Sequence, residues 1–335
     1  MKKVVLSLSG GVDSAVAARL LQKNGYTVSG LYLDIAAASA RADAVAVADF
    51  LEIPLTVQDV SEALETAVCA PFAESYLRGE TPNPCILCNP TVKFAALLAE
   101  ADRCGADFIA TGHYARTEGG GLYRGVPAND QSYMLCRLTR PELVRLLLPL
   151  GEYGKSEVRA LAREFEIPVA DKPDSMEICF IPDQDYAGWI TRRAALPGSG
   201  RFLWDGAIVG THEGIHRWTV GQRIPGVFGA EAVKLYVRRI DAGSGDIEVC
   251  PDAGLFRTEF TARDFRWLTD TPAGPVRGSV KVRHSRAECP DCTAEPLADG
   301  SVRFHCKTPV RAPAPGQSAV LYDGDRVLGG GFIVS

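Results

Sequence analysis

A short run of glycine and serine residues near the start of the chain has the composition of an anion-binding loop. Ser9-Gly10-Gly11-Val12-Asp13-Ser14 lies between an apolar stretch typical of a buried strand and a stretch typical of a helix. Glycines let backbone N–H groups approach an anion closely, the helix N-terminus adds positive partial charge, and the serine hydroxyls add donors. The run has no lysine of the Walker type, so it predicts a phosphate site without implying transfer of a γ-phosphate.

These six residues resemble the pyrophosphatase loop (PP-loop) of enzymes that cleave ATP to AMP and pyrophosphate. The resemblance implies a nucleotide site rather than a glycine turn before an ordinary helix. A loop of that kind suits chemistry in which a carbonyl oxygen is adenylated and becomes a leaving group. The remaining question is which nucleophile displaces it.

Two motifs contain cysteines whose context favours reactive thiols. Cys85 and Cys88 follow Thr81-Pro82-Asn83-Pro84, and Cys179 lies within the run from Asp174 to Ile181. A thiolate is a good nucleophile near neutral pH, and a second thiol can resolve a disulfide formed by the first. The Cys-x-x-Cys spacing alone also suits zinc or redox chemistry. Because free cysteine is among the most buried residue types, we expect structural positions for Cys69, Cys104, Cys136 and Cys250.

Three later cysteines, Cys289, Cys292 and Cys306, could form a zinc knuckle with His284 or His305. The region contains no second paired motif, and the cysteines fall on strands that we expect to be adjacent. The pattern therefore favours a structural role over zinc binding.

The elements that must position these motifs alternate between strand and helix in the first half of the chain, which is typical of a parallel sheet with crossover helices. The loop follows a strand predicted over 3–8 and opens a helix predicted over 13–24. The motifs lie at turns or strand ends, where functional residues often occur. Other strands are predicted over 27–33, 56–60 and 107–110, and other helices over 43–51, 62–78, 91–103 and 156–165.

The second half has short strands separated by Gly, Pro and Asp turns, which is typical of β-rich domains. We therefore expect an α/β fold in three parts. A parallel-sheet, PP-loop ATP-binding domain occupies 1–195, a small β-rich domain occupies 196–254, and a β-barrel-like domain occupies 255–335.

Composition indicates an ordinary globular protein. The chain has 335 residues, of which 46% are hydrophobic and 23% charged, so it is long enough for several domains. The apolar stretch near its start is too short and too often interrupted by glycine for a signal peptide. No segment is long enough to span a membrane. Ten cysteines without a secretory signal predict a reducing compartment, the cytoplasm, and argue against structural disulfides.

Net charge gives no sign of a nucleic-acid-binding protein, since it is -5 with a pI near 5.7. Local basic clusters weaken that conclusion, although such clusters are more often solvated faces. They are Arg192-Arg193, Arg238-Arg239 and the run from Lys281 to Arg286.

Motifs in the same order over the full length make the chain similar to the bacterial tRNA-specific 2-thiouridylase family. Besides the loop and the cysteine motifs, the resemblance rests on Ala110-Thr111-Gly112-His113-Tyr114, Asp130-Gln131-Ser132-Tyr133, Thr219-Val220-Gly221-Gln222-Arg223, Pro315-Gly316-Gln317 and Leu328-Gly329-Gly330-Gly331. It implies replacement of the C2 oxygen of the wobble uridine, position 34 of tRNA, by sulfur at the expense of ATP.

The resemblance also implies a role for individual residues. Asp13 belongs to the adenylation site, Cys179 carries persulfide sulfur, and Cys88 is the thiol that completes the transfer. Asn83, Pro84 and Cys85 lie against the target base. ATP, accompanied by Mg²⁺, is held by Ser7, Leu8, Ser9, Gly10, Gly11, Val12, Asp13, Ser14, Leu33 and Gly112. The resemblance also assigns tRNA contact to the small β-rich domain over 196–254. Further contacts with tRNA come from His113, Asn129, Asp130, Gln131, Arg283, His284 and Gln317.

The implied partners are tRNAs of the Lys, Glu and Gln type and a sulfur donor. The donor is a cysteine desulfurase, a relay protein or sulfide itself.

Three positions depart from the family pattern. Many members have Asp at the position of Cys85, so this chain offers three thiols, Cys85, Cys88 and Cys179, which could hold three irons of a 4Fe-4S cluster and leave one iron open for sulfide. The persulfide and cluster versions both remain open, and both require the three cysteines to converge. In addition, Asp34 to Ala40 is a shortened loop beside the nucleotide site, and Asn129 replaces a usual lysine.

Two other functions compete with this interpretation. One is another PP-loop adenylating enzyme, such as a tRNA cytidine thiolase or an amidating synthetase, but these lack the paired contexts of Cys88 and Cys179 and the two β-rich domains. The other is a noncatalytic tRNA-binding module with an ATP-binding fold, which the presence of Asp13 and Cys179 disfavours.

Overall fold

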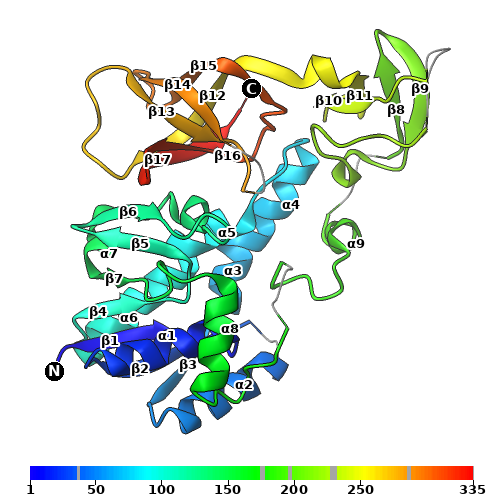
Figure 1. Cartoon of the computed structure of the whole chain (residues 1–335). Helices are drawn as coiled ribbons and strands as arrows, with labels where there is room; N and C mark the ends of the chain where they lie inside the picture. Colours follow the sequence, from blue (N-terminus) through cyan, green and yellow to red (C-terminus); the bar gives the residue numbers. More distant parts are fainter. Residues whose placement is uncertain (36–37, 174–177, 195–197, 227–231, 285–287, 335) are drawn as a thin grey trace. The chain divides into compact units, whose positions relative to one another are not determined.

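The computed structural model describes residues 1–35, 38–173, 178–194, 198–226, 232–284 and 288–334 (Figure 1). The chain divides into two compact units that alternate along the sequence. The first contains Met1–Val68, Cys85–Met176 and Asp325–Val327. The second contains Cys69–Pro84, Glu177–Gly324 and Leu328–Ser335.

The first unit is built on a parallel sheet with the strand order β3-β2-β1-β4-β7. Because β1 has β2 on one side and β4 on the other, the strand order reverses at β1. Open parallel sheets bind ligands at the carboxyl ends of the strands at such a point. The strands are β1 (Lys3–Ser7), β2 (Thr27–Asp34), β3 (Leu55–Asp59), β4 (Phe108–Ala110) and β7 (Leu146–Leu147).

Helices α1 (Val12–Lys23) and α8 (Lys155–Glu164) share one apolar core with β1. The core includes Val16 of α1, Val158 of α8 and Leu6 of β1, all fully buried. The predicted strand–loop–helix order and the predicted helix over 156–165 are confirmed to within two residues. Helix α2 (Ala38–Phe50) begins earlier than predicted, and α7 (Arg140–Arg145) was not predicted.

Both long helical stretches contain a π-helical turn, which sequence periodicity did not reveal. The stretch predicted over 62–78 consists of α3 (Ser61–Leu64), a π turn (Glu65–Cys69) and α4 (Ala70–Leu77). The stretch predicted over 91–103 begins earlier, with α5 (Pro84–Cys88), and continues through a π turn (Asn89–Lys93) into α6 (Phe94–Cys104). The prediction that Cys85 and Cys88 lie at a turn was therefore wrong. Pro84 begins α5, in keeping with the fixed φ that suits proline to a first helical position.

A hairpin of β5 (Ala115–Glu118) and β6 (Gly121–Arg124) follows β4 and was also not predicted. Its turn residues Gly119 and Gly120 have φ of 56° and 75°, the left-handed conformation that two-residue hairpin turns of type I′ require.

The second unit is rich in β-structure, as predicted. A small sheet has the order β10-β11-β8-β9, and a larger one has the order β12-β15-β14-β13-β16-β17, with a further β12–β17 pairing that closes it. The strands of the small sheet are β8 (Gly200–Trp204), β9 (Ala207–His212), β10 (Tyr236–Ile240) and β11 (Ile247–Cys250). Those of the closed sheet are β12 (Phe256–Trp267), β13 (Val276–Lys281), β14 (Cys289–Pro296), β15 (Val302–Arg311), β16 (Ser318–Asp323) and β17 (Arg326–Ile333).

Within the described parts of the chain, no helix is both long and apolar enough to cross a membrane.

Candidate functional site

The glycine-rich loop joins the carboxyl end of β1 to the start of α1 and is fixed by its own serines. The Ser14 hydroxyl accepts a hydrogen bond from the Ser9 backbone N–H at 3.1 Å and donates one to the Gly11 carbonyl at 3.1 Å. Gly10 has φ of 73°, and a Cβ there would lie 2.4 Å from the Ala40 carbonyl oxygen. Only glycine fits this position, because both the backbone conformation and the available space exclude a side chain.

The start of α1 is suited to an anion. Its N-cap residue is Gly11, which has no side chain to accept hydrogen bonds from the first helical N–H groups. Those N–H groups and the positive end of the helix dipole therefore remain available to a phosphate. The loop meets the geometric requirement for binding the phosphates of a nucleotide.

A second loop touches the first from the carboxyl end of β4. A Cβ on Gly112 would lie 2.9 Å from the Ser14 backbone nitrogen and 3.0 Å from the Asp13 carbonyl carbon. The close approach of the two backbones explains why glycine is needed at 112. Leu33 lies near the carboxyl end of β2, beside β1. The residues predicted to hold ATP therefore lie at one edge of the sheet, where the strand order reverses.

Three side chains that sequence analysis missed also reach the loop. The Tyr114 hydroxyl donates to an Asp13 carboxylate oxygen at 2.7 Å, and the Lys155 ammonium donates to both Asp13 oxygens at 2.8 and 2.7 Å. The Lys172 ammonium donates to the Gly10 carbonyl at 3.1 Å and also pairs with Asp43. The two lysines lie more than a hundred residues from the loop in the chain, so no local pattern could have identified them.

His113 follows Gly112 and is held in place from two sides. Its Nδ1 is 2.7 Å from the Thr111 hydroxyl oxygen, and its ring is stacked on Phe94 with the centroids 6.3 Å apart. Burial lowers the pKa of His113 well below its usual value, and the charge of Lys93 lowers it further. The imidazole is therefore neutral near pH 7.

The side chains of Asn129, Asp130 and Gln131, predicted to contact tRNA, bond within the protein. The Asn129 amide oxygen accepts from the Lys155 backbone N–H at 3.1 Å, and the Gln131 amide oxygen accepts from the Tyr114 backbone N–H at 3.0 Å. The buried Asp130 carboxylate accepts from the backbone N–H groups of Gly125 and Ser132. This segment therefore orients residues of the nucleotide site.

Cys85 is the second residue of the short helix α5 and Cys88 is its last. They are three residues apart and therefore occupy neighbouring positions on the helix surface. Cys85 is exposed and Cys88 is half-buried. Burial raises the pKa of the Cys88 thiol, while Lys93 lowers it and Cys85 raises it.

Cys179 belongs to the second unit and is exposed. The next residue, Phe180, is anchored in an aromatic cluster, with its ring centroid 5.5 Å from that of Phe72 and 5.2 Å from that of Trp189. The anchored neighbour fixes the backbone on one side of the thiol. The preceding motif residues, 174–177, lie outside the described residues.

The predicted base-contacting residues Asn83 and Pro84 follow Thr81, which forms hydrogen bonds with the turn between β15 and β16. The Thr81 N–H donates to the Pro315 carbonyl at 2.7 Å, and the Gln317 side-chain amide donates to the Thr81 carbonyl at 2.8 Å. Gln317, which was predicted to contact tRNA, thus forms a hydrogen bond with Thr81, two residues before Asn83.

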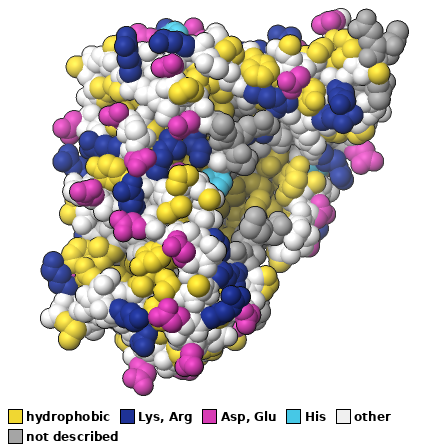
Figure 2. All heavy atoms as spheres, viewed as in Figure 1, with side chains coloured by type: hydrophobic (Ala, Val, Ile, Leu, Met, Phe, Trp, Pro, Cys, Tyr) yellow, Lys and Arg dark blue, Asp and Glu magenta, His cyan; other side chains and the backbone are white. Residues whose placement is uncertain are grey.

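The remaining residues predicted to contact tRNA are Arg283 and His284. The Arg283 guanidinium donates to the Val220 carbonyl, and His284 is exposed. On the face drawn in Figure 2, basic and acidic side chains are interspersed rather than separated by sign.

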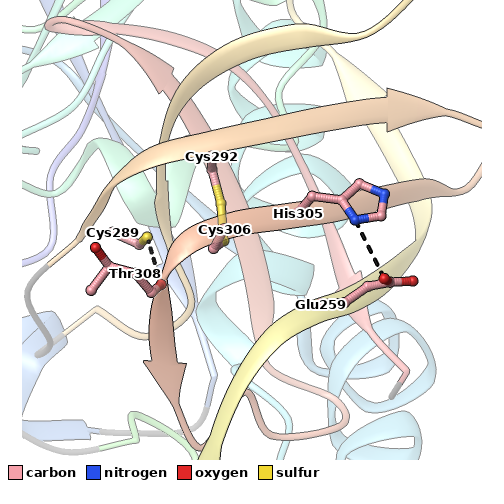
Figure 3. The surroundings of a disulfide bond; sticks show 6 residues. All are labelled: Glu259, Cys289, Cys292, His305, Cys306 and Thr308. Atoms are coloured by element: carbon pink, nitrogen blue, oxygen red, sulfur yellow. Dashed lines mark hydrogen bonds and ion pairs between the residues drawn. A yellow bond between two sulfur atoms is a disulfide. The ribbon is translucent and has the colours of Figure 1, made fainter.

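The cysteines of the closed sheet lie close together. Cys292 on β14 and Cys306 on β15 are directly paired and joined by a disulfide (Figure 3). The expectation that the chain has no structural disulfide was therefore wrong, while the expectation of adjacent strands is confirmed. The thiol of the buried Cys289 donates to the Thr308 carbonyl, and the three sulfurs lie within 4.8 Å of one another.

His305 faces away from this group of cysteines, and its Nδ1 lies 3.3 Å from a Glu259 carboxylate oxygen (Figure 3). The three sulfurs are close enough together to hold a metal ion, so the choice between a structural role and zinc stays a prediction.

Of the four cysteines expected to be buried, Cys69, Cys136 and Cys250 are buried, but Cys104 is exposed. Cys104 continues the buried stripe of Phe94, Leu97 and Ala101 on α6. It is the last residue of the helix, before Gly105 in left-handed conformation, where the core no longer covers the stripe.

Comparison with known proteins gives matches over nearly the whole chain. Residues 2–183 match the model of a tRNA methyl transferase HUP domain, 195–251 a tRNA methyl transferase PRC-barrel domain, and 257–333 an aminomethyltransferase beta-barrel domain. The chain is 41% identical to the tRNA-specific 2-thiouridylase MnmA of Geotalea uraniireducens, covering 99% of this chain and 95% of the relative. Proteins of the same name from Rhodospirillum centenum and Syntrophotalea carbinolica are each 42% identical, with 99% of this chain covered and 91% and 98% of the relatives.

Proposed function

The chain belongs to the tRNA-specific 2-thiouridylase family, and on that premise we propose that it uses ATP to replace the C2 oxygen of the wobble uridine of tRNA with sulfur. The observation that carries the ATP-dependent part is the meeting of two loops at the carboxyl edge of the parallel sheet. There, the N-terminus of α1 and the close approach of Gly112 to Ser14 form a cradle for phosphates.

The cradle suits adenylation. The α1 N-terminal N–H groups would stabilise the negative charge of pyrophosphate as the C2 oxygen attacks the α-phosphorus of ATP. Mg²⁺ would accompany the phosphates, and Asp13 is the carboxylate that the loop offers to it. Leu33, near the end of β2, and Gly112, after β4, complete the residues that we assign to ATP binding.

The thiols supply the second half of the reaction. In the persulfide route, the terminal sulfur of a Cys179 persulfide bonds to C2 and AMP leaves with the former C2 oxygen. The Cys88 thiolate then attacks the Cys179 sulfur, which leaves 2-thiouridine on the tRNA and a Cys88–Cys179 disulfide on the protein. A thiol reductant must reopen that disulfide. The exposure of Cys179 allows a sulfur donor to load it.

The alternative route uses a 4Fe-4S cluster, for which Cys85 and Cys88 fit as ligands because they lie three residues apart on one short helix. Cys179, in the second unit, would be the third ligand. Such a cluster would supply an iron that binds sulfide. In both routes Asn83, Pro84 and the residue at 85 would receive the target base.

Recognition of tRNA would depend on local basic groups, since the chain as a whole is acidic. The exposed His284 and the Arg238-Arg239 pair lie in the second unit, although Arg239 already pairs with Glu248 at 2.7 Å. We assign tRNAs of the Lys, Glu and Gln type as substrates, and a cysteine desulfurase, a relay protein or sulfide as the donor, with the cytoplasm as the place of action.

The division into domains over 1–195, 196–254 and 255–335 remains our proposal. Its support is the spacing of the three matched family models, which cover 2–183, 195–251 and 257–333.

Reconstitution tests the function directly. The full chain, purified without oxygen, is given tRNA, Mg²⁺, ATP labelled at the α-phosphate and a persulfide or sulfide donor. We expect 2-thiouridine by nucleoside mass spectrometry and AMP in equal amount, both dependent on ATP. Formation of 2-thiouridine without AMP, or AMP release that does not depend on tRNA, would contradict the proposal.

A further inference from the structure

Two lysines reach the nucleotide loop from segments that follow it by more than a hundred residues. The Lys155 ammonium lies 2.8 and 2.7 Å from the Asp13 carboxylate oxygens, at the α1 end of the loop. The Lys172 ammonium lies 3.1 Å from the Gly10 carbonyl oxygen, at the β1 end, and also pairs with Asp43. Both ends of the loop therefore have a cation beside them, although the loop itself contains none.

Stability does not explain these two ion pairs. The side chains of Lys155 and Asp13 are 24% and 30% exposed, and those of Lys172 and Asp43 are 33% and 36% exposed. Ion pairs that are open to water contribute only about 0–1 kcal/mol to stability. Both lysine side chains are thus partly exposed, and their ammonium groups lie within hydrogen-bond distance of loop atoms.

The position of Lys155 is fixed through its backbone rather than its side chain. It is the first residue of α8, and its N–H donates to the Asn129 amide oxygen at 3.1 Å. Asp13 also has a second partner, the Tyr114 hydroxyl at 2.7 Å. The Lys155 ammonium can therefore turn away from Asp13 while the Lys155 backbone and the Asp13 carboxylate both keep a hydrogen bond.

We propose that Lys155 and Lys172 are phosphate-binding residues that take the place of the lysine absent from the loop. Asp13 and Asp43 hold the two ammonium groups beside the loop, and the phosphates of the nucleotide compete with these carboxylates for them. A lysine ammonium suits this exchange because it is a compact charge with several donors on a flexible stem. When the Lys155 ammonium leaves Asp13, the Asp13 carboxylate becomes able to bind Mg²⁺. The inference rests on the proposed nucleotide site.

The test measures binding of ATP, inorganic pyrophosphate and adenosine to the full chain by calorimetry. We expect Lys155→Gln and Lys172→Gln each to weaken pyrophosphate and ATP binding about tenfold or more, the effect of losing a charge-assisted hydrogen bond. Adenosine binding should be unchanged, because adenosine has no phosphate. Lys155→Arg and Lys172→Arg should keep much of the affinity. Lys23→Gln is the matched control, since Lys23 lies in the last turn of α1, over the Phe165 ring.

A gain of affinity tests the competition and cannot come from misfolding. Asp43→Asn removes the carboxylate that holds Lys172 and should strengthen pyrophosphate binding severalfold. Affinities within twofold of wild type in both Gln variants, or weaker binding in Asp43→Asn, would overturn the inference while leaving the proposed function intact. A wild-type chain that binds neither ATP nor pyrophosphate would overturn both.

Discussion

The Gln317 side-chain amide donates a hydrogen bond to the backbone carbonyl of Thr81 at 2.8 Å. Thr81 lies two residues before Asn83, the first residue assigned to the target base. The neighbouring Gly316 has φ of 85°, and a Cβ there would lie 2.9 Å from the Thr81 nitrogen, so the Pro315-Gly316-Gln317 turn closely contacts this segment. Gln317 is therefore a positioning residue for the segment that leads to the target base.

Replacing Gln317 should loosen that segment without affecting nucleotide binding. We expect Gln317→Glu, which keeps the shape but cannot donate to a carbonyl, to lower the rate of tRNA thiolation about tenfold and leave ATP affinity unchanged. Hydrogen exchange of the Thr81 amide, bonded to the Pro315 carbonyl at 2.7 Å, should become faster. If Gln317 only contacts tRNA, the variant will bind tRNA more weakly with no change in the exchange of Thr81.

Loss of either transfer thiol should abolish thiolation. We expect no 2-thiouridine from Cys88→Ser or Cys179→Ser, because serine neither carries a persulfide nor resolves one. ATP binding should persist, since neither residue belongs to the phosphate cradle. Cys104→Ser is the matched control, because Cys104 is exposed like Cys179 but lies at the end of α6. Retained thiolation in either test variant, measured by nucleoside mass spectrometry, would disprove the two-thiol mechanism.

The parts of the site that are local in sequence were predictable, and the parts that depend on distant segments were not. The strand, glycine-rich loop and helix around Ser9 to Ser14 follow from apolar periodicity and backbone chemistry over about twenty residues. Lys155 and Lys172 reach the same loop only because the chain returns to the edge of the sheet. Nothing in the residues around either lysine marks them as partners of Asp13 or Gly10.

Some missed elements did carry a local signal. Gly119-Gly120 is a recognised turn pair for a two-residue hairpin, and Pro84 has the residue type that often begins a helix. The π turns over Glu65–Cys69 and Asn89–Lys93 had no such signal, since helical periodicity does not distinguish one wide turn. Cys104 was expected to be buried from its residue type alone, which takes no account of its place at a helix end.

Stability should depend on pH through two buried histidines of the second unit. Burial lowers the pKa of both His212 and His216, and each is at most 5% exposed. In the described parts of the chain neither ring nitrogen of His216 has a hydrogen-bond partner. The unfolded chain thus binds protons at pH values where these folded imidazoles stay neutral.

This difference in proton binding sets the direction in which stability changes with pH. Stability is full above the unfolded histidine pKa, near 6.5, and falls as pH decreases below it toward the lowered pKa of the folded state. We expect urea unfolding at pH 7.5, 6.5 and 5.5 to show this loss. His216→Leu should reduce the slope of the unfolding free energy against pH by the equivalent of up to one proton. His284→Leu is the control, because His284 is exposed. An unchanged slope in His216→Leu would show that folding does not lower the pKa of His216.

Cys85 separates the two routes of sulfur transfer, because the family resemblance implies Asp at this position in many members. If Cys85, Cys88 and Cys179 hold a cluster, Cys85→Asp should remove iron and activity from the anaerobically purified protein, since a carboxylate is a poor substitute for a soft thiolate ligand. If a persulfide carries the sulfur, Cys85→Asp should stay active without iron.

We expect the first outcome, because the additional thiol lies three residues before Cys88 on α5, at the position that we assign to the target base, where the cluster route would require an iron that binds sulfide. Iron and sulfide analysis, absorbance near the cluster band and 2-thiouridine formation are measured on the same preparation. Cys85→Ser completes the comparison: the cluster route predicts that it loses iron and activity, whereas the persulfide route does not require a thiol at 85. An iron-free Cys85→Asp protein that thiolates tRNA with ATP and a persulfide donor would establish the persulfide route instead.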